Sequence, residues 1–582
     1  TEEPTAKRRS DARQKGQVAR SQELSGAFVL LAGFFVMRAL GSTILSEIET
    51  YTVHIYANMN QTIDAETVMH LIIDGMIVLA KTAFPVMIAI LIMGLAVNFY
   101  QVGFMFTTEP LSFKLDKLNP ITGFGRIFSK RSVVELLKSL LKIAIIGAGL
   151  AGLTAAYELR DHEVDVFEAD DRIGGKLRTV AFNDGPVDMG AEAYLAVRTD
   201  ATDFFESLGL GDHVVYPSDA RPAIYAGSEL HAMPTETVMG IPATSDAVEG
   251  LISTEEAVHI DAERNRESLD WQVGEDRCLG IMLRQRYGDG IVDHVVSALL
   301  GGVYSSGADA LGVRATIPQL AAMFDEMAEA GEKITVSGAV EKLLARRGPR
   351  KGPVFATFSG GYAELYETLA EKSGASIHID SFISELTPQM LEKYDRILLA
   401  TPAPTTAILL RTIAPEASAE LKKVELASSA VVGLKFDNTE GLPDNSGILV
   451  ATDEPDVQVK AFTFSSNKWP HLRERGGALV RASFGRFGEN ILLNTTEADL
   501  VDRALEDLTR VTGYRGEPSE IFVQHWYGGL PRYDHDHLAR VATVRSLLSN
   551  VPQIGVAGAW ADGVGVPNVI AGARKAAREL LG

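Results

Sequence analysis

The sequence has almost no cysteine, because Cys278 is the only one among 582 residues. A single thiol excludes an internal disulfide framework and a cysteine-based zinc or iron–sulfur site. Apolar residues make up 46% of the chain, which is enough for large buried cores. The length and composition therefore predict two to four domains, and we expect no metal site.

Basic charge is scarce in the longer, C-terminal part of the chain. Residues 1–142 contain 15 Lys and Arg against 12 Asp and Glu, whereas residues 143–582 contain 40 against 64. The second part therefore carries a formal charge of about −24. Such a charge repels phosphates, so we expect no nucleic-acid partner. The contrast indicates that two unrelated segments have been joined.

Residues 1–142 contain two apolar stretches with basic flanks. The first runs from about 27 to 45 and is interrupted only by Arg38, and the second runs from about 71 to 100. The portion 82–99 has no charge over 18 residues, which is long enough for a helix to cross the roughly 30 Å hydrocarbon core. The loop between them, about 46–68, is acidic, so both basic ends should lie in the cytoplasm. We expect an α-helical membrane segment with two transmembrane helices; a pair of buried core helices is the alternative.

Two long motifs in this segment are specific. They are EPTAKRRSDARQKGQVARSQEL at 3–24 and KLNPITGFGRIFS at 117–129. Both resemble the FlhB/YscU family of type III export proteins, and the resemblance ends near residue 142. The family's later helices and its self-cleaving Asn-Pro-Thr-His motif are missing, so we expect a membrane anchor and not an export switch. A natural fusion, a designed chimera and a gene-model error all fit this join.

A glycine-rich dinucleotide-binding signature begins at residue 143. An apolar strand precedes Gly147, Gly149 and Gly152, a helix follows, and a second strand ends at Glu168, 19 residues after Gly149. These glycines permit a tight turn, a close approach to a pyrophosphate and close helix packing, and the acid is spaced to bind ribose hydroxyls. The helix N-terminus then faces the phosphates. The cofactor-binding residues expected in this element are Gly147, Gly149, Leu150, Ala151, Gly152, Glu168 and Ala169.

Further segments complete this pattern. A second glycine turn follows at 171–176, where a basic residue usually contacts the diphosphate and where Lys176 replaces the usual Arg. A glycine-rich strand, turn and helix recurs at 554–573, near the C-terminus. A cofactor held by both ends of a unit of about 440 residues implies tightly bound FAD and not exchangeable NAD. The cofactor-binding residues expected in these two segments are Arg172, Gly174, Gly175, Lys176, Trp560, Gly565, Val566 and Pro567.

Six motifs spread over residues 143–582 carry a narrower resemblance. They are GAEAYL at 190–195, LGGVYSSG at 300–307, LGVRATIP at 311–318, SSNKWPH at 465–471, LPRYDHDHL at 530–538 and GVGVP at 563–567. They are similar to the flavin amine-oxidase superfamily and, within it, to HemY-type protoporphyrinogen/coproporphyrinogen oxidases, although many members have Gln in place of Arg532. The resemblance implies an enzyme of haem biosynthesis with non-covalent FAD. Such an enzyme oxidises coproporphyrinogen III or protoporphyrinogen IX to the porphyrin with O₂ and releases H₂O₂.

Three residues are candidates for orienting the substrate. Arg198 lies where this family often places a cation facing the substrate propionates; a surface Arg paired with Asp200 or Asp203 is the alternative. Tyr304 and Gly302, in a predicted glycine turn, are expected to shape the cavity, unless that turn is purely structural. No catalytic general base is assigned, and Cys278 is expected to be inert.

The expected fold class is α/β. It comprises a two-dinucleotide-binding, Rossmann-like FAD domain, a mixed-sheet substrate domain and a helical insert, preceded by an α-helical membrane segment. The expected limits are 1–142 for the membrane segment, 143–220, 355–410 and 541–582 for the FAD domain, 221–242 and 411–540 for the substrate domain, and 243–340 for the insert.

Two other functions compete with porphyrinogen oxidation. One is amine or polyamine oxidation on the same flavin scaffold, and the other is a role in the type III secretion apparatus carried by residues 1–142. The expected partners are a porphyrinogen, O₂ and a membrane, and a homodimer or a contact with the next haem-pathway enzyme is left open. We expect a membrane anchor with a cytoplasmic catalytic part, or a cytoplasmic protein if the N-terminal segment is an artefact.

Overall fold

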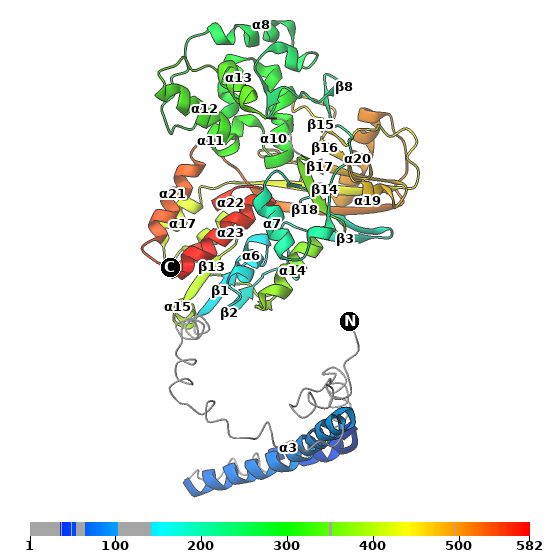
Figure 1. Ribbon diagram of the computed structural model, residues 1–582, viewed down its shortest axis with the longest axis vertical. Coiled ribbons are helices and arrows are strands. Elements are labelled where there is room, and N and C mark those ends of the chain that lie inside the picture. Colours follow the sequence, from blue (N-terminus) through cyan, green and yellow to red (C-terminus); the bar gives the residue numbers. More distant parts are fainter. Residues whose placement is uncertain are drawn as a thin grey trace, which may run out of the picture. The chain divides into compact units, whose positions relative to one another are not determined.

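The chain folds into two compact units, Thr1–Ser129 and Lys130–Gly582. The computed structural model describes residues 35–36, 38–47, 49–53, 65–102, 141–348, 352–493 and 495–582. In the smaller unit these residues are helical, and in the larger unit they form sheets and covering helices (Figure 1).

The smaller unit contains the long helix α3 (Ala65–Val102), next to a shorter helical stretch within residues 35–53. The two are joined by an ion pair of 3.1 Å between Lys81 Nζ and Glu47 Oε2. Gly75 of α3 faces the ring of Tyr51, whose hydroxyl would lie 2.7 Å from a Cβ at that glycine. The absence of a side chain at Gly75 therefore lets the two helical segments approach closely.

The membrane prediction is supported in part. Among the described residues, one helical stretch is long and apolar enough to cross a membrane, Ile73–Met93 within α3, and none of it is buried. Residues 27–34 of the first predicted span, and the basic tail after residue 102, lie outside the described residues. The predicted loop 46–68 is wrong at both ends, since residues 49–53 and 65–68 are helical. The Lys81–Glu47 and Gly75–Tyr51 contacts hold the helical stretch that ends at residue 53 against α3.

A five-stranded parallel sheet forms one half of the larger unit. Its central strand β1 is short and apolar, and its residues alternate between the two faces of the sheet. Ile143 and Ile145 belong to one buried cluster, and Ala144 and Ile146 to another, on the opposite face. The strands, in spatial order, are β12 (Ser376–His378), β2 (Glu163–Phe167), β1 (Lys142–Ile146), β13 (Arg396–Leu399) and β19 (Ile554–Val556).

Helices cover both faces of this sheet, as expected for buried parallel strands. The helices that share a cluster with Ile143 are α6 (Leu150–Glu158), α7 (Thr199–Ser207), α14 (Ala363–Ser373) and α23 (Val566–Leu581). Those that share a cluster with Ala144 are α15 (Pro388–Lys393), α16 (Ala403–Leu410), α17 (Pro415–Leu421), α21 (His537–Leu548) and α22 (Ala559–Asp562).

A second, seven-stranded sheet is mixed, with β15 and β7 parallel and its other pairs antiparallel. The amphipathic helix α20 (Glu497–Thr512) packs through Leu500, Ala504 and Leu508 into the same buried cluster as this sheet. The strands, in spatial order, are β18 (Glu520–Pro531), β14 (Leu426–Phe436), β17 (Ala478–Phe484), β16 (Val459–Phe464), β15 (Gly447–Val450), β7 (Ala223–Ala226) and β8 (Glu229–Ala232).

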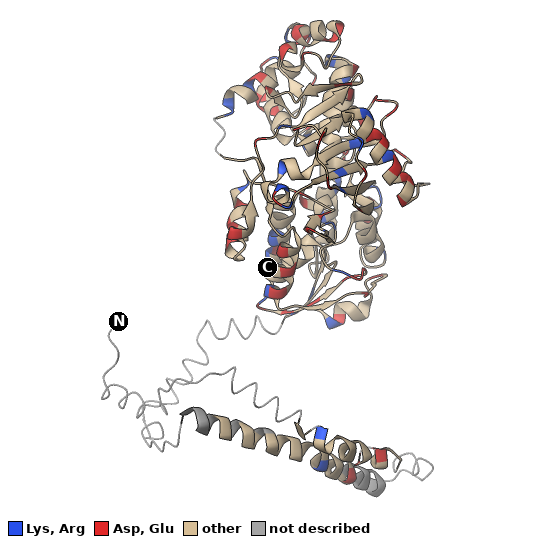
Figure 2. Cartoon of the chain, turned by 90° about the vertical axis from the view of Figure 1, so that its right-hand side faces the viewer, with Lys and Arg blue, Asp and Glu red and all other residues tan. Residues whose placement is uncertain are grey.

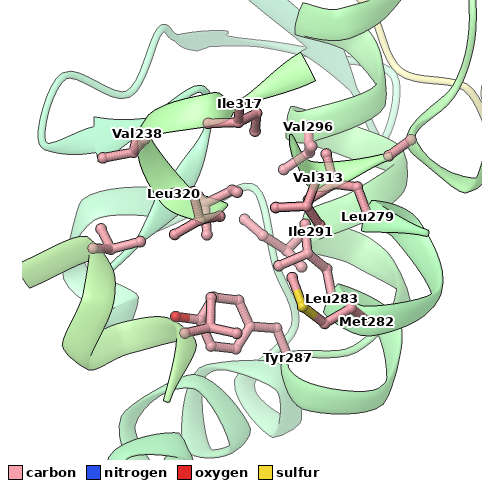
Figure 3. Close-up of a cluster of buried hydrophobic side chains, with 14 of the residues drawn as sticks. Val238, Leu279, Met282, Leu283, Tyr287, Ile291, Val296, Val313, Ile317 and Leu320 are labelled. Carbon is pink, nitrogen blue, oxygen red and sulfur yellow. The ribbon is translucent and has the colours of Figure 1, made fainter. Parts of the chain in front are cut away.

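Helices between β8 and β11 (Phe355–Phe358) enclose their own buried core. Figure 3 shows part of this core, including Val296, Val313 and Leu320. The helices are α8 (Thr254–Ala262), α9 (Leu279–Arg286), the π-helical turn η6 (Ile291–Val296), α10 (Ser297–Tyr304), α11 (Val313–Thr316), α12 (Pro318–Glu329) and α13 (Val336–Arg346).

Short elements connect these parts. Acidic and basic residues are interspersed along the chain of the larger unit (Figure 2). The remaining strands are β3 (Thr179–Phe182), β4 (Gly185–Asp188), β5 (Tyr194–Leu195), β6 (Val214–Val215), β9 (Thr237–Val238), β10 (Ile241–Pro242) and β11 (Phe355–Phe358). The remaining helices are α18 (Ser465–Lys468), α19 (Pro470–Arg473) and the 3₁₀ turns η3 (Gly211–His213), η4 (Ser245–Val248), η5 (Glu263–Asn265) and η7 (Ala308–Ala310). The larger unit thus has an α/β fold with mixed sheets and helices; the predicted domain limits remain a prediction.

Candidate functional site

The first glycine turn joins β1 to α6 at the carboxyl edge of the parallel sheet, where ligands bind in folds of this kind. Gly147 has a φ of +104°, and a Cβ there would lie 2.7 Å from the carbonyl oxygen of Ala400. A Cβ at Gly152 would lie 1.8 Å from the carbonyl oxygen of Gly147. Helix α6 therefore sits against the turn more closely than any side chain allows. Leu150 and Ala151, its first two residues, are buried.

The second glycine turn lies directly against the first. The amide of Gly174 donates to the carbonyl of Ala148 over 2.9 Å, and a Cβ at Gly175 would lie 2.9 Å from the Cα of Gly149. Gly174 and Gly175 both have positive φ, of +98° and +57°. The structure thus brings together the two turns that the sequence assigns to one cofactor.

Glu168 follows β2 and lies beside the first turn. Its Oε2 accepts a hydrogen bond of 2.6 Å from the amide of Ala148, and its Oε1 accepts one of 3.0 Å from Asp170. The carboxylate is therefore held at the rim of the glycine turn, where an acid that binds a ribose is needed. Ala169, the next residue, is exposed.

The two cations of the second turn have different surroundings. The Arg172 guanidinium donates to the carbonyls of Ile173, Leu177 and Gly175, at 3.1, 3.2 and 2.8 Å, so it stabilises the turn itself. Lys176 makes one longer contact, 3.4 Å from its Nζ to the carbonyl of Gly528. Desolvation, and then the charge of Arg172, lower the pKa of Lys176. Of the two, Lys176 is the better candidate for contacting a diphosphate.

The C-terminal glycine segment reaches the same sheet edge. Strand β19 ends at Val556, and α23 begins at Val566 with Pro567 in its first turn, after Gly565 at a φ of +104°. Helix α23 packs on α6 within one buried cluster. Trp560 lies in α22, between β19 and α23 along the chain; it is 3% exposed and donates from Nε1 to the carbonyl of Thr401 over 3.0 Å. Its side chain anchors the segment in the core.

Arg198 is engaged by neighbouring side chains. Its guanidinium pairs with both carboxylate oxygens of Asp200, at 3.0 and 2.8 Å, and donates to Asn568 Oδ1 over 2.6 Å. The side-chain hydrogen bond to Asp200 raises the pKa of Arg198. The pairing with Asp200 is the alternative that the sequence left open, and a role toward a substrate remains a prediction.

The predicted turn at Gly301 and Gly302 is wrong, because both residues lie inside α10. A Cβ at Gly301 would lie 3.4 Å from Arg486 Nε, and one at Gly302 would lie 3.7 Å from a methyl of Leu449. Both are ordinary van der Waals distances, so the packing of α10 against Arg486 and Leu449 accommodates these glycines without requiring them. Tyr304 ends α10, and burial raises its pKa to about 12. Its hydroxyl donates to the carbonyl of Thr316 over 3.4 Å.

Three side chains that could carry chemistry, Cys278, Tyr533 and His537, are packed against neighbouring groups. Cys278 precedes α9 and lies 3.0 Å from the carbonyl of Asp309, and burial raises its pKa. The ring of His537 stacks on Tyr533 at 4.2 Å and lies 2.8 Å from the carbonyl of Trp560. Burial lowers the pKa of His537. These contacts pack the three side chains in place, but His537 Nδ1 is buried without a hydrogen-bond partner among the described residues. Among the described residues, no group of three or more His, Cys, Asp or Glu is placed to hold a metal ion.

A buried charge cluster was missed from the sequence. The Glu192 carboxylate lies 2.7 Å from Lys468 Nζ and 3.3 Å from an Arg481 nitrogen. Desolvation alone would raise the pKa of Glu192, but the charges of Lys468 and Arg481 outweigh it and hold the pKa at about 2. Glu192 and Lys468 lie in two of the motifs quoted above, but no local spacing signals a contact across 276 residues.

Comparisons with known proteins agree with this geometry. Residues 150–581 match the family described as flavin containing amine oxidoreductase. The chain is 36% identical over 452 residues to a coproporphyrinogen III oxidase of Mycobacterium bovis, covering 75% of this chain and 96% of that protein. A crystal structure of a putative protoporphyrinogen oxidase from Exiguobacterium sp. 255-15 matches with a TM-score of 0.67 at 27% identity, over 76% of this chain and all of that one.

The chain therefore belongs to the flavin-containing amine oxidoreductase family. It is an oxidoreductase of the flavin amine-oxidase superfamily, and its relatives include proteins named coproporphyrinogen III oxidase. A flavin is the cofactor that this family implies.

The N-terminal part has a separate origin. Residues 1–162 match the FlhB HrpN YscU SpaS family, and 152 residues are 40% identical to the flagellar biosynthetic protein FlhB of Bacillus subtilis, of which the chain covers 41%. The match extends 20 residues beyond the end expected at 142 and overlaps the flavoprotein match over 150–162. The fusion predicted from the sequence is thus supported from both sides. The match and the apolar helix α3 point to association with a membrane.

Proposed function

We propose that the larger unit is an FAD-dependent oxidase that converts coproporphyrinogen III to its porphyrin, with O₂ as electron acceptor and H₂O₂ as second product. The observation that carries this proposal is the meeting of the two glycine turns, beside Glu168, at the sheet edge where α6 and α23 begin. The substrate is inferred from the names of relatives that cover three quarters of this chain and nearly their own whole length. Protoporphyrinogen IX is the competing substrate.

The residues present fit a flavin dinucleotide. Side chains at Gly147, Gly152 or Gly175 would collide with backbone, so the cradle depends on bare glycines. Helix α6 has no side-chain cap at its N-terminus, which leaves its first N–H groups for an anionic ligand. The residues that would hold FAD are Gly147, Gly149, Leu150, Ala151, Gly152, Glu168, Ala169, Arg172, Gly174, Gly175, Lys176, Trp560, Gly565, Val566 and Pro567.

The flavin should be bound without a covalent link. The sole cysteine of the chain, Cys278, belongs to the helical region and lies against the carbonyl of Asp309. Its position just before α9 is distant in sequence from the C-terminal glycine segment, so that segment provides no thiol for attachment. Acid precipitation should therefore release the flavin into solution.

A flavin held by these residues would supply the two-electron redox chemistry that links oxidation of a porphyrinogen methylene bridge to reduction of O₂ to H₂O₂. Because the porphyrin is six electrons more oxidised than the porphyrinogen, each product molecule requires three such rounds and yields three H₂O₂. The protein's part is to hold the cofactor and to orient the substrate. Arg198, Gly302 and Tyr304 remain the candidates for that orientation, and no general base is assigned.

The full chain, purified in detergent, tests this function with three separate substrates. We expect coproporphyrinogen III to give rapid growth of porphyrin fluorescence, together with three O₂ consumed for each porphyrin formed. Protoporphyrinogen IX should react more slowly, and putrescine should not consume O₂. Parallel samples without protein measure autoxidation of the porphyrinogens, and catalase identifies H₂O₂ by returning half of the oxygen.

Each other result has a definite meaning. Oxygen uptake with putrescine alone would assign the chain to amine oxidation on the same fold. A preference for protoporphyrinogen IX would support the proposed oxidase activity but would assign it a different substrate. Flavin-containing protein that oxidises none of the three compounds would contradict the proposed function.

We infer further that residues 1–142 anchor the enzyme in a membrane with both basic ends in the cytoplasm. The apolar helix α3 and the charge of its flanks support this topology. In sealed vesicles of cytoplasmic-side-out orientation, the oxidase should act on added porphyrinogen without detergent. In right-side-out vesicles, activity should appear only after the membrane is opened. Activity in intact right-side-out vesicles, or in the soluble fraction of a cell lysate, would contradict the anchor.

A further inference from the structure

The charge cluster of Glu192, Lys468 and Arg481 joins the segment between β4 and β5 to α18 and the seven-stranded sheet. Glu192 lies between β4 and β5, whereas Lys468 ends α18 and Arg481 lies in β17 of the seven-stranded sheet. The side chains of Glu192 and Arg481 are 13% and 9% exposed, and Ser465 Oγ also donates to Glu192 over 2.6 Å. One carboxylate therefore contacts three donors, two from α18 and one from β17.

The same arginine holds the backbone next to Glu192. Arg481 Nη2 donates to the carbonyl of Gly190 over 2.8 Å, while its Nη1 faces Glu192. A guanidinium can bridge two acceptors in this way because its donors are fixed in one plane. The indole of Trp526, from β18, adds a hydrogen bond of 3.0 Å to the carbonyl of Met189. Residues 189–192 are thus fixed to the seven-stranded sheet at three points.

This fixed segment lies directly against the second glycine turn. A Cβ at Gly190 would lie 2.1 Å from the carbonyl oxygen of Lys176, and the amide of Met189 donates to the carbonyl of Arg178 over 2.7 Å. Lys176 and Arg172 lie 5.8 and 6.0 Å from the ring of Trp526. A shift of residues 189–192 would therefore be transmitted to the turn at 174–176.

We propose that the Glu192–Lys468–Arg481 cluster sets the position of the 174–176 turn for the flavin, which makes Glu192 and Arg481 positioning residues for cofactor binding. The inference rests on the flavin site of the proposed function. A buried ion pair does not by itself imply such a role, because pairs of this kind often add little to stability. This cluster differs because Arg481 also binds the carbonyl of Gly190, and Gly190 packs against Lys176 of the cofactor turn.

Flavin affinity of the full chain, stripped of cofactor and titrated with FAD, tests the inference. E192Q removes the charge that holds both cations, and we expect about a tenfold rise in the Kd for FAD, the scale found for outer-shell supports of metal sites. R481K keeps a cation beside Glu192, but a single ammonium cannot also donate to the carbonyl of Gly190. We therefore expect weaker FAD binding. The melting temperature of the stripped protein should stay near that of wild type.

D293N provides the matched control. Asp293 pairs with Arg284 at 2.6 Å in the helical region, and Arg284 keeps its contacts with Asp289 and Asp309 when Asp293 loses its charge. This variant should bind FAD within about twofold of wild type, because Asp293 contacts Arg284 and Thr452 and shares no partner with the Glu192 cluster.

The reduction potential of the bound flavin is a second readout, because a purely structural salt bridge would not change it. In R481K saturated with FAD, the potential should differ from that of wild type, and in D293N it should not. Wild-type affinity and potential in both E192Q and R481K, even with a lowered melting temperature, would overturn the inference alone. Wild-type protein that takes up no flavin would overturn the flavin site and the inference with it.

Discussion

Gly152→Ala weakens flavin binding at least about a hundredfold, the effect expected when a site is misplaced by about 1 Å. The added Cβ would lie 1.8 Å from the carbonyl oxygen of Gly147 and 3.3 Å from a methyl of Ile145. Neither neighbour is the flexible end of a side chain, because one is the backbone of Gly147 and the other is Ile145 of the buried strand β1. Helix α6 or the glycine turn must therefore move, and the contact between Ala148 and Gly174 moves with it. The measurement is the flavin content of the purified variant, followed by titration with FAD.

Gly348→Ala is the control for this prediction. Nothing lies within 4 Å of a Cβ at Gly348, and Gly348 does not have the positive φ that favours glycine. This variant should purify with a full complement of flavin. If G152A retained wild-type flavin content and affinity, the close approach of α6 to the turn would not be the basis of the site.

Glu263→Ala costs about 3–5 kcal/mol of stability, the cost of breaking a buried ion pair. Glu263 is fully buried and accepts hydrogen bonds from the amides of Val336 and Ser337, at 2.9 and 3.0 Å, and from the Ser337 hydroxyl at 2.5 Å. It lies 3.7 Å from Arg286. The carboxylate thus caps the N-terminus of α13, where the helix dipole favours negative charge. The variant leaves these donors buried without an acceptor.

Thermal unfolding and hydrogen exchange of α13 measure this effect. Because a chain of several domains does not unfold in two states, the first transition is the one that should move to lower temperature. Glu341→Ala, in the same helix, is the control: its side chain is 62% exposed and 4.0 Å from Arg264, so its loss should cost under about 1 kcal/mol. Equal melting temperatures for E263A and E341A would contradict the role of Glu263.

Local patterns explain which features could be predicted from the sequence. The apolar strand at 143–146, the glycines after it and the acid at Glu168 act within about 25 residues, and hydrophobic periodicity and turn chemistry are readable over that distance. The sequence assigned both glycine turns to one cofactor, whereas the direct contact between the turns is seen only in the structure. The hydrogen bonds of Arg172 to its own turn were not foreseen, because charge alone does not reveal which acceptor a guanidinium uses.

The errors have tertiary causes. Gly301 and Gly302 predict a turn, because each glycine in a helix costs about 1 kcal/mol relative to alanine. The fold overrides that preference and continues α10 through both glycines, which face Arg486 and Leu449 at van der Waals distance. Glu192 gave no signal, because its partners Lys468 and Arg481 are brought to it only by the fold. The helical residues 49–53 were placed in a loop for a similar reason, as Tyr51 packs against Gly75 of α3.

The visible spectrum of the full chain during anaerobic addition of coproporphyrinogen III tests the central claim most directly. Without O₂, a bound flavin that accepts hydride from the porphyrinogen should lose its visible absorbance at once, and admission of O₂ should restore it as porphyrin absorbance appears. The same titration with putrescine should leave the flavin oxidised. A flavin that stays oxidised in the presence of coproporphyrinogen III and protoporphyrinogen IX, or a protein that carries no flavin, would contradict the account.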